Sequence, residues 1–371
     1  MRAGNCPSRA APLRLRLVLA GRRRQCPDMA TIQDVARRAG VSTATVSRVL
    51  SAPQVVAEAT RERVLAAVDR LGYAPNTAAK SLRTLRTQKI LVTVPDISNP
   101  FFSQVIRGVE AAAQAAGYSV LLGDTRHDPD REEQYGQMLR RKEADGLVFL
   151  GHRLPDSLAE MVEAMGARAP IVNGCEFSPD LAVSSAHIDN ARAAAEAMKH
   201  LYDLGHSRVG VISGPLASPI SRDRLTGACD AAARHGQARG LAVAVGDFSI
   251  ESGLEQTLIL LRPETRPTAI FCFSDEMAMG ALEAFRRSGL SCPGDISLIG
   301  FDDIRYAQYL DPPLTTVSQP MDQIGQEAVR LLLGILSGEA PEVLNLTLAH
   351  QLVVRASCGP ASQQRPDAGP A

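Results

Sequence analysis

The 371-residue chain contains no tryptophan, and aromatic residues make up only 4% of it. Its seven cysteines are scattered and form no CxxC pair, which argues against a disulfide framework or a zinc site and favours reduced thiols in the cytoplasm. No run of 18 apolar residues is present, so we expect no transmembrane helix and no membrane partner. The motifs GxGxxG, Walker A, HExxH and GxSxG are missing, and the seven histidines are dispersed. We therefore expect a cytoplasmic protein that is not an enzyme and has no metal or cofactor.

Charge is unevenly distributed, although the formal net charge is zero. Residues 1–28 carry a net charge of +6, residues 29–89 carry another +6, and the remainder carries −12. A basic head on an acidic body indicates that the head meets a polyanion. In residues 1–28 an arginine cluster follows the apolar run, the reverse of a secretory signal. We interpret this extension as disordered, or as a start assigned too early, with Met29 as the true start.

Residues 29–75 have the pattern of a small helical domain. The segment "TIQDVARRAG" begins with Thr31 as a candidate N-cap, has Asp34 three residues later and ends at Gly40. A short turn separates it from "TATVSRVL", and two helices joined in this way are typical of a helix-turn-helix. A third helix is predicted in "AEATRERVLAAVDRLGY", with an apolar face formed by Val64, Leu65, Val68 and Leu71.

The second of these helices carries the candidate DNA-reading residues. In a helix-turn-helix it enters the major groove, and its N-terminal residues contact base edges. Thr43 and Ala44 suit a thymine methyl, and Arg48, one turn further on the same face, suits guanine. The alternative for Arg48 is a solvated helix arginine. Contacts with the DNA backbone are expected from Thr31, Ser42, Thr45 and Ser47.

After Lys89, apolar segments alternate with helical stretches, which predicts parallel strands in a doubly wound α/β fold. The predicted strands are "ILVTVPD", "SVLLGDT", "ADGLVFLG", "APIVNG", "RVGVISG", "LAVAVGDF", "TAIFCFSD" and "DISLIGFDD". These are too many for one sheet of ordinary size, so we expect two similar lobes facing each other. Such sheets bind ligands at the carboxyl ends of their strands. Those ends here carry Asp96, Asp124, Glu176, Phe248, Asp275 and Asp302.

The segments "TIQDVARRAGVSTATVSRVL" and "YAPNTAAKSL", followed by "PFFSQVIRGVE", "HIDN" and "SLIGFDDI", resemble the LacI/GalR family of bacterial repressors from residue 29 to about 358. Within that family, "FCFSDEMAMGAL" and "DPPLTT" are most similar to its cytidine-responsive branch. The resemblance implies a homodimer that reads a pseudo-palindromic double-stranded DNA operator. It also implies a core like the type I periplasmic binding proteins, with a small-molecule effector between its lobes.

The resemblance also implies the domain boundaries. The helix-turn-helix domain spans 29–75, a hinge helix and linker 76–88, the two-lobed core 89–358, and a disordered tail 359–371. The N-lobe is expected to contain about 89–188 and 319–346, and the C-lobe about 189–318 and 347–358. In the stretch "YAPNTAAKSLRTLRTQK" the resemblance implies a hinge helix that folds only on DNA and contributes Asn76, Lys80 and Leu82 to the interface.

Replacing Leu82 by alanine is accordingly expected to lower operator affinity in a gel shift. An apolar wedge in a minor-groove step kinks the duplex, and the cost of about a few kcal/mol is offset by added contacts. So short a basic helix is unstable alone and needs its partner and DNA. Effector binding, followed by calorimetry, is expected to stay intact. Parental operator affinity in the variant would make the segment a plain linker.

Several cleft residues are implied by the same resemblance. Phe101 and Phe102 suit stacking on a flat ring, although one of them is expected to pack in the core. Asp124 is either a hydrogen-bond acceptor for the effector or a helix cap. Arg224 matches the family arginine that contacts the effector, and the alternative is a surface salt bridge with its neighbour Asp223.

Phe248 matches the family's stacking aromatic, and Asp302 matches its acidic acceptor for paired sugar hydroxyls. Glu176 and Asp275 are weaker candidates. Aromatic rings combined with carboxylates suit a nucleoside, and also suit a sugar. Ser218 and Ile220 stand where purine-responsive relatives carry polar or basic residues, which argues for a pyrimidine nucleoside, cytidine first. A sugar-binding transport protein shares the two-lobed core, but it would need a signal peptide and no basic head.

Overall fold

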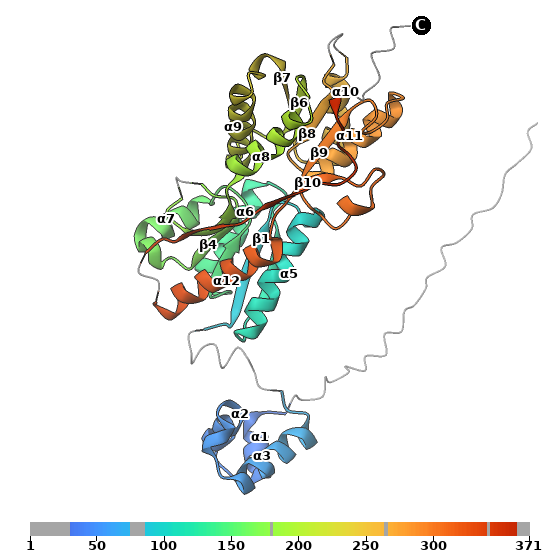
Figure 1. Cartoon of the computed structure of the whole chain (residues 1–371). Helices are drawn as coiled ribbons and strands as arrows, with labels where there is room; N and C mark the ends of the chain where they lie inside the picture. The colour runs from blue at the N-terminus through green and yellow to red at the C-terminus, as the bar shows by residue number, and fades with distance from the viewer. Residues whose placement is uncertain (1–29, 75–85, 179–180, 263–265, 340–341, 362–371) are drawn as a thin grey trace, which may run out of the picture. The chain divides into compact units, whose positions relative to one another are not determined.

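The computed structural model describes residues 30–74, 86–178, 181–262, 266–339 and 342–361. These residues form two compact units, a head before the hinge segment and a core after it (Figure 1). The expected hinge helix and its residues Asn76, Lys80 and Leu82 lie outside the described residues, as does the extension 1–28. None of the described helices combines the length and the apolar character needed to cross a bilayer.

The head consists of three helices, as predicted: α1 (Ile32–Ala39), α2 (Thr43–Ser51) and α3 (Glu58–Leu71), with a 3-10 turn η1 (Pro53–Val55) before α3. The predicted start of α1 is confirmed, because Thr31 and Asp34 form a reciprocal capping box. Gly40 ends the helix at φ 64°, a left-handed conformation that glycine adopts without steric cost.

Valines from each helix meet in the core of the head. Val35, Val46 and Val64 are all 0% exposed. One detail of the predicted apolar face is wrong, because Leu65 is 46% exposed and Ala67 is buried in its place. The residues that face α1 along α3 follow a spacing of three and four, and Leu65 lies outside that stripe.

The N-lobe contains a six-stranded sheet in the order β11-β5-β4-β3-β1-β2, with all of its strand pairs parallel. Its strands are β1 (Lys89–Val94), β2 (Ser119–Asp124), β3 (Gly146–Phe149), β4 (Ile171–Cys175), β5 (Ser184–Ile188) and β11 (Asn345–Leu348). Its helices are α5 (Pro100–Ala115), α6 (Pro129–Arg140), α7 (Asp156–Met165) and α12 (Met321–Ser337), with a 3-10 turn η2 (Gly166–Arg168).

The C-lobe repeats this arrangement with the order β12-β10-β9-β8-β6-β7, in which only the β10–β12 pair is antiparallel. Its strands are β6 (Val209–Ser213), β7 (Leu241–Val245), β8 (Ala269–Cys272), β9 (Ser297–Asp302), β10 (Thr315–Ser318) and β12 (Gln351–Val353). Its helices are α8 (Asn190–Asp203), α9 (Pro219–Arg234), α10 (Ile250–Leu260) and α11 (Asp275–Arg287), with 3-10 turns η3 (Ala238–Gly240) and η4 (Ala307–Tyr309).

All eight predicted strands are therefore confirmed, and the two-lobed α/β class with them. Sequence reasoning missed β5, β10, β11 and β12. The strands β5 ("SSAHI") and β10 ("TTVS") are rich in serine and threonine and lack the apolar run that marks the others, although both are largely buried.

Three short segments join the lobes: β5 leads into α8, β10 leads into α12, and β11 leads into β12. In the N-lobe α12 lies against α5 (Figure 1). A Cβ added at Gly325 of α12 would lie 2.2 Å from the Val105 carbonyl oxygen of α5, so only glycine permits this close crossing. The carboxyl ends of strands from both sheets border the space between the lobes.

Candidate functional site

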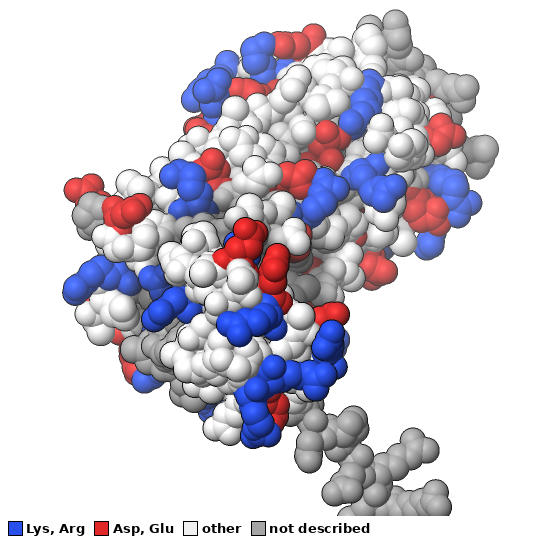
Figure 2. All heavy atoms as spheres, turned by 90° about the horizontal axis from the view of Figure 1, so that it is seen from below, with Lys and Arg blue, Asp and Glu red and all other residues white. Residues whose placement is uncertain are grey.

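The start of α2 presents the residues that sequence reasoning assigned to DNA. Thr43, Ala44 and Arg48 are exposed, while Val46 and Val49 of the same helix are buried. This separates an outward face from a face that holds the helix in the domain. In Figure 2, Lys and Arg side chains form a group at the lower right of the foremost part of the surface, with Asp and Glu side chains among them.

Two of the residues assigned to phosphates also cap helices. The Ser42 hydroxyl accepts from the Thr45 backbone N–H at 3.1 Å and lies 2.9 Å from the Thr45 hydroxyl. Thr31 donates its hydroxyl proton to Asp34 at 2.6 Å. Hydroxyl oxygens have two acceptor sites and one proton, so capping leaves capacity for a further partner. Ser47 lies between the buried Val46 and the exposed Arg48.

A cleft of about 930 Å³ lies between the lobes of the core. Such a volume is typical of small-molecule sites. The strand ends supply most of the predicted candidates that border it, with two from α5 and one from α9. They are Phe101, Phe102, Asp124, Glu176, Arg224, Phe248 and Asp302.

Strained backbone concentrates at this cleft. Among the residues that the structure describes, eight other than glycine have a positive φ, and five of these border the cleft: Arg126, His127, Cys175, Phe248 and Asp302. Such conformations cost about 1–3 kcal/mol each and persist where the surroundings impose them, often at ligand sites. The strain therefore marks the cleft as a functional site independently of its shape.

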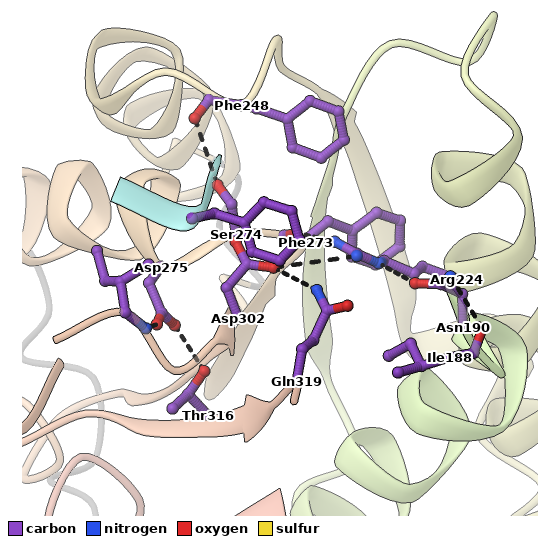
Figure 3. Close-up of polar contacts among 12 residues, drawn as sticks. Ile188, Asn190, Arg224, Phe248, Phe273, Ser274, Asp275, Asp302, Thr316 and Gln319 are labelled. Carbon is purple, nitrogen blue, oxygen red and sulfur yellow. Dashed lines mark hydrogen bonds and ion pairs between the residues drawn. The ribbon is translucent and has the colours of Figure 1, made fainter. Parts of the chain in front are cut away.

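Arg224 and Asp302 form the polar centre of the cleft (Figure 3). Arg224 is 3% exposed, which excludes the surface salt bridge considered as its alternative role. Its Nε donates to Asn190 Oδ1 at 2.8 Å, its Nη1 donates to the Phe273 carbonyl, and its Nη2 lies 4.0 Å from Asp302 Oδ1. The guanidinium carbon also lies 3.6 Å from the centre of the Phe301 ring.

Burial changes the titration of both groups. It lowers the pKa of Arg224 to about 10, an effect opposed by Asp302 and Glu176, so the guanidinium remains charged at neutral pH. Burial raises the pKa of Asp302 to about 7, while Arg224 and a hydrogen bond donated by Gln319 oppose the rise. Gln319 Nε2 lies 2.8 Å from Asp302 Oδ1. The cleft thus holds a permanent cation beside a carboxyl that titrates near neutrality.

Asp275 does not belong to this site, contrary to expectation. It is 0% exposed and accepts from the Ile304 N–H at 2.8 Å and from the Thr316 hydroxyl at 2.6 Å. Its carboxyl therefore ties β10 to the segment that follows β9, as Figure 3 shows. Its neighbours Ser274 and Glu276 border the cleft instead.

Two aromatic side chains suit stacking. The Phe248 ring covers Gly214, where an added Cβ would lie 2.1 Å from the ring. Phe102 is partly exposed and meets Phe101 edge to face, with ring centres 5.2 Å apart. Phe101 is 7% exposed and belongs to the core, as expected for one of the pair.

Asp124 borders the cleft, but its carboxylate already has a partner. The Arg126 Nε donates to it at 2.9 Å, and Arg131 lies 3.7 Å away. The cap of α6 is Asp128, so the alternative role of Asp124 as a helix cap is excluded.

Other residues that border the cleft were not anticipated. They include His152, Gln319, Glu276 and Arg126. Asp96, which was expected at the end of the first strand of the core, borders the cleft as well. Gln319 follows β10, one of the four strands that the sequence pattern did not reveal. Burial, then Asp96, Asp302 and Glu251, raises the pKa of Glu276 to about 7. Within the described part of the chain, no group of His, Cys, Asp and Glu side chains is arranged to hold a metal ion.

Comparison with known proteins identifies the family. The chain is 42% identical over 329 residues to the HTH-type transcriptional repressor CytR of Escherichia coli (strain K12), covering 88% of this chain and 96% of that protein. The chain belongs to the LacI family. Residues 31–76 match the model of the lacI family of bacterial regulatory proteins, and residues 198–358 match a periplasmic binding protein-like domain.

Two further members of the LacI family support this assignment. The HTH-type transcriptional repressor PurR of Photobacterium profundum is 39% identical over 331 residues, which cover 89% of this chain and 98% of that protein. The lac repressor dimer bound to operator and the anti-inducer ONPF has a TM-score of 0.80 and 32% identity, with 88% and 98% of the two chains covered. The chain is thus a DNA-binding transcriptional repressor, which confirms the predicted family and function class.

Proposed function

We propose that this LacI-family repressor binds a pseudo-palindromic operator as a homodimer, and that a pyrimidine nucleoside in the interlobe cleft changes its operator affinity. Cytidine is the first candidate. The observation that carries the proposal is the combination of two partly exposed aromatic residues, Phe102 and Phe248, with the buried acceptor Asp302 in one cleft. Rings suit a base, and a carboxylate suits the paired hydroxyls of a ribose.

Coupling to DNA follows from where the cleft lies. An effector that contacts both lobes favours one relative arrangement of them, and it shifts the equilibrium by its difference in affinity for the two arrangements. The three short segments that join the lobes accommodate this movement. Lobe movement that separates the paired hinges would weaken operator binding.

The charge of the cleft restricts the ligand. Seven carboxyl groups border it, against two arginines and two histidines: Asp96, Asp124, Glu176, Asp247, Glu251, Glu276, Asp302, Arg126, Arg224, His127 and His152. Both arginines already contact aspartates. A phosphate would therefore enter against net negative charge, with both arginines of the cleft already engaged.

Calorimetry is expected to show that cytidine binds and that cytidine 5′-monophosphate binds about tenfold more weakly or worse, because the phosphate is repelled. The same titration with a purine nucleoside and with free sugars tests the alternatives. If no nucleoside bound while a sugar bound clearly, the nucleoside proposal would be wrong. A gel shift with operator DNA, with and without cytidine, tests the coupling.

A further inference from the structure

The Glu176 carboxyl faces the cleft with most of its hydrogen-bonding capacity unused. Glu176 follows β4 and is only 7% exposed. Its Oε2 lies 3.4 Å from the Ser218 hydroxyl and 3.5 Å from His152 Nδ1, both long for a hydrogen bond. Its Oε1 accepts no hydrogen bond from the residues that the structure describes. A carboxylate has about four acceptor sites, so a ligand donor has room here.

The two arginines nearest to Glu176, Arg222 and Arg224, donate hydrogen bonds to other groups. Arg222 donates to the carbonyl groups of Leu216 and Ala217. Arg224 donates to Asn190 and Phe273. Both arginines act on Glu176 through space only. Among the described residues, therefore, no arginine forms an ion pair with this buried carboxyl.

Two further titratable groups among the described residues lie next to Glu176, namely His152 and Cys175. Burial, then Arg153, lowers the pKa of His152, so this imidazole is neutral near pH 7. Burial raises the pKa of the Cys175 thiol, which keeps it neutral as well. Burial also raises the pKa of Glu176 to about 7, while Arg224, Ser218 and Arg222 lower it. Both protonation states of Glu176 are thus populated near neutrality.

We propose that Glu176 selects effectors whose base carries an exocyclic amino group, which donates a hydrogen bond to its carboxylate. The inference rests on the proposed nucleoside effector and adds a rule for its base. An ionised carboxylate only accepts hydrogen bonds. An amino group satisfies it, whereas a keto oxygen in the same place would leave two acceptors facing each other in a buried site.

Cytidine and uridine provide the matched pair of ligands. Cytidine carries an amino group at C4 and no proton on N3. Uridine carries a keto group at C4 and a proton on N3. Above pH 7 Glu176 is ionised, so cytidine is expected to bind about 10- to 100-fold more tightly than uridine. Below pH 7 the protonated carboxyl can donate its proton to the keto oxygen. Uridine binding therefore recovers by about tenfold between pH 8 and pH 6, as expected for one proton on a group with a pKa of about 7, and the preference shrinks.

Glu176→Gln is expected to remove both the preference and its pH dependence. The glutamine amide can present either its N–H₂ group or its oxygen to the ligand, so it serves an amino or a keto group. Asp302→Asn is the contrasting variant. Because Asp302 is assigned to the ribose, this change is expected to weaken cytidine and uridine alike and to leave their ratio unchanged at a given pH.

The experiment is calorimetry of the full chain with cytidine and uridine at pH 6 and pH 8, for the parent, Glu176→Gln and Asp302→Asn. A parental preference that is larger at pH 8 and disappears in Glu176→Gln supports the inference. If cytidine bound and Glu176→Gln kept the parental preference, Glu176 would not read the base, and the nucleoside proposal would stand. If the parent bound no nucleoside at either pH, the proposed function itself would fail.

Discussion

Replacing Arg224 by methionine is expected to abolish the influence of the effector on operator binding, because effector affinity falls about 100-fold or more. Truncating one member of a buried, hydrogen-bonded charge pair in a binding site costs about 2–5 kcal/mol of binding free energy, and each 1.4 kcal/mol is a factor of ten. Methionine keeps much of the length of the arginine side chain without its charge. The variant therefore tests charge and hydrogen bonding more than volume.

Arg224 affects effector affinity through the protonation state of Asp302. Burial raises the pKa of Asp302 to about 7 even though Arg224 opposes the rise. Without the guanidinium, this pKa rises further and Asp302 is protonated at neutral pH. A protonated carboxyl is a poorer acceptor for ribose hydroxyls. Protonation also limits the cost of the unpaired charge to folding, so the head and its operator affinity are expected to survive.

Calorimetry measures the effector affinity of Arg224→Met, and a gel shift with and without cytidine measures the coupling. The matched control is Arg234→Met, an exposed arginine at the other end of α9. It is expected to behave like the parent in both assays. Parental effector affinity in Arg224→Met would show that the guanidinium only supports the fold around Asn190 and Phe301.

The head was accessible to sequence reasoning because its signals are local. The Thr31–Asp34 cap, the Gly40 stop and the short turn are all contained within a few residues. Leu65 was misplaced because it lies next to Val64 at the margin of the apolar stripe, and periodicity alone did not locate the boundary between the buried and the exposed face. In the core, strands with apolar runs were found, and those rich in serine and threonine were not.

The cleft was predicted only in part, because a residue at the end of a strand can point its side chain either into the cleft or into the interior of the lobe. The carboxyl end of a strand is a local feature, so Asp302 and Glu176 could be singled out. Asp275 has the same sequence context, yet its carboxyl turns into the fold toward Thr316. Gln319, directly after β10, donates a hydrogen bond to Asp302, and β10 pairs with β9 across the sheet. No sequence spacing reveals such a pair.

Large apolar side chains remain exposed at several places on the C-lobe, and the most exposed of them lies between β9 and β10. Tyr309, in the segment between β9 and β10, is 75% exposed, and Tyr306 is 47% exposed. In the N-lobe, Leu122 of the edge strand β2 is 42% exposed. Aromatic side chains often anchor interfaces, and an edge strand with exposed apolar residues needs a cover. The second copy proposed for operator binding would supply that cover.

Tyr309→Asp is expected to convert the homodimer into a monomer and to lower operator affinity about 100-fold or more. A dimer brings two heads to two half-sites, and the second contact gains from a high effective concentration that a monomer lacks. The side chain is already largely in water, so the change adds charge to a surface without disturbing the core. Effector binding by the isolated monomer is expected to persist and serves as a test of folding.

Sedimentation measures the oligomeric state of Tyr309→Asp, and a gel shift measures its operator affinity. The matched control is Val243→Asp on β7, at the edge of the C-lobe sheet remote from β10, where the valine is 44% exposed. Both variants place an aspartate at an exposed apolar position of the C-lobe, and they differ chiefly in location. A monomeric Val243→Asp beside a dimeric Tyr309→Asp would move the interface to the β7 edge. If both variants remained dimers, both surfaces would be excluded as the interface. The contact between the subunits would then involve other elements, such as β2 of the N-lobe.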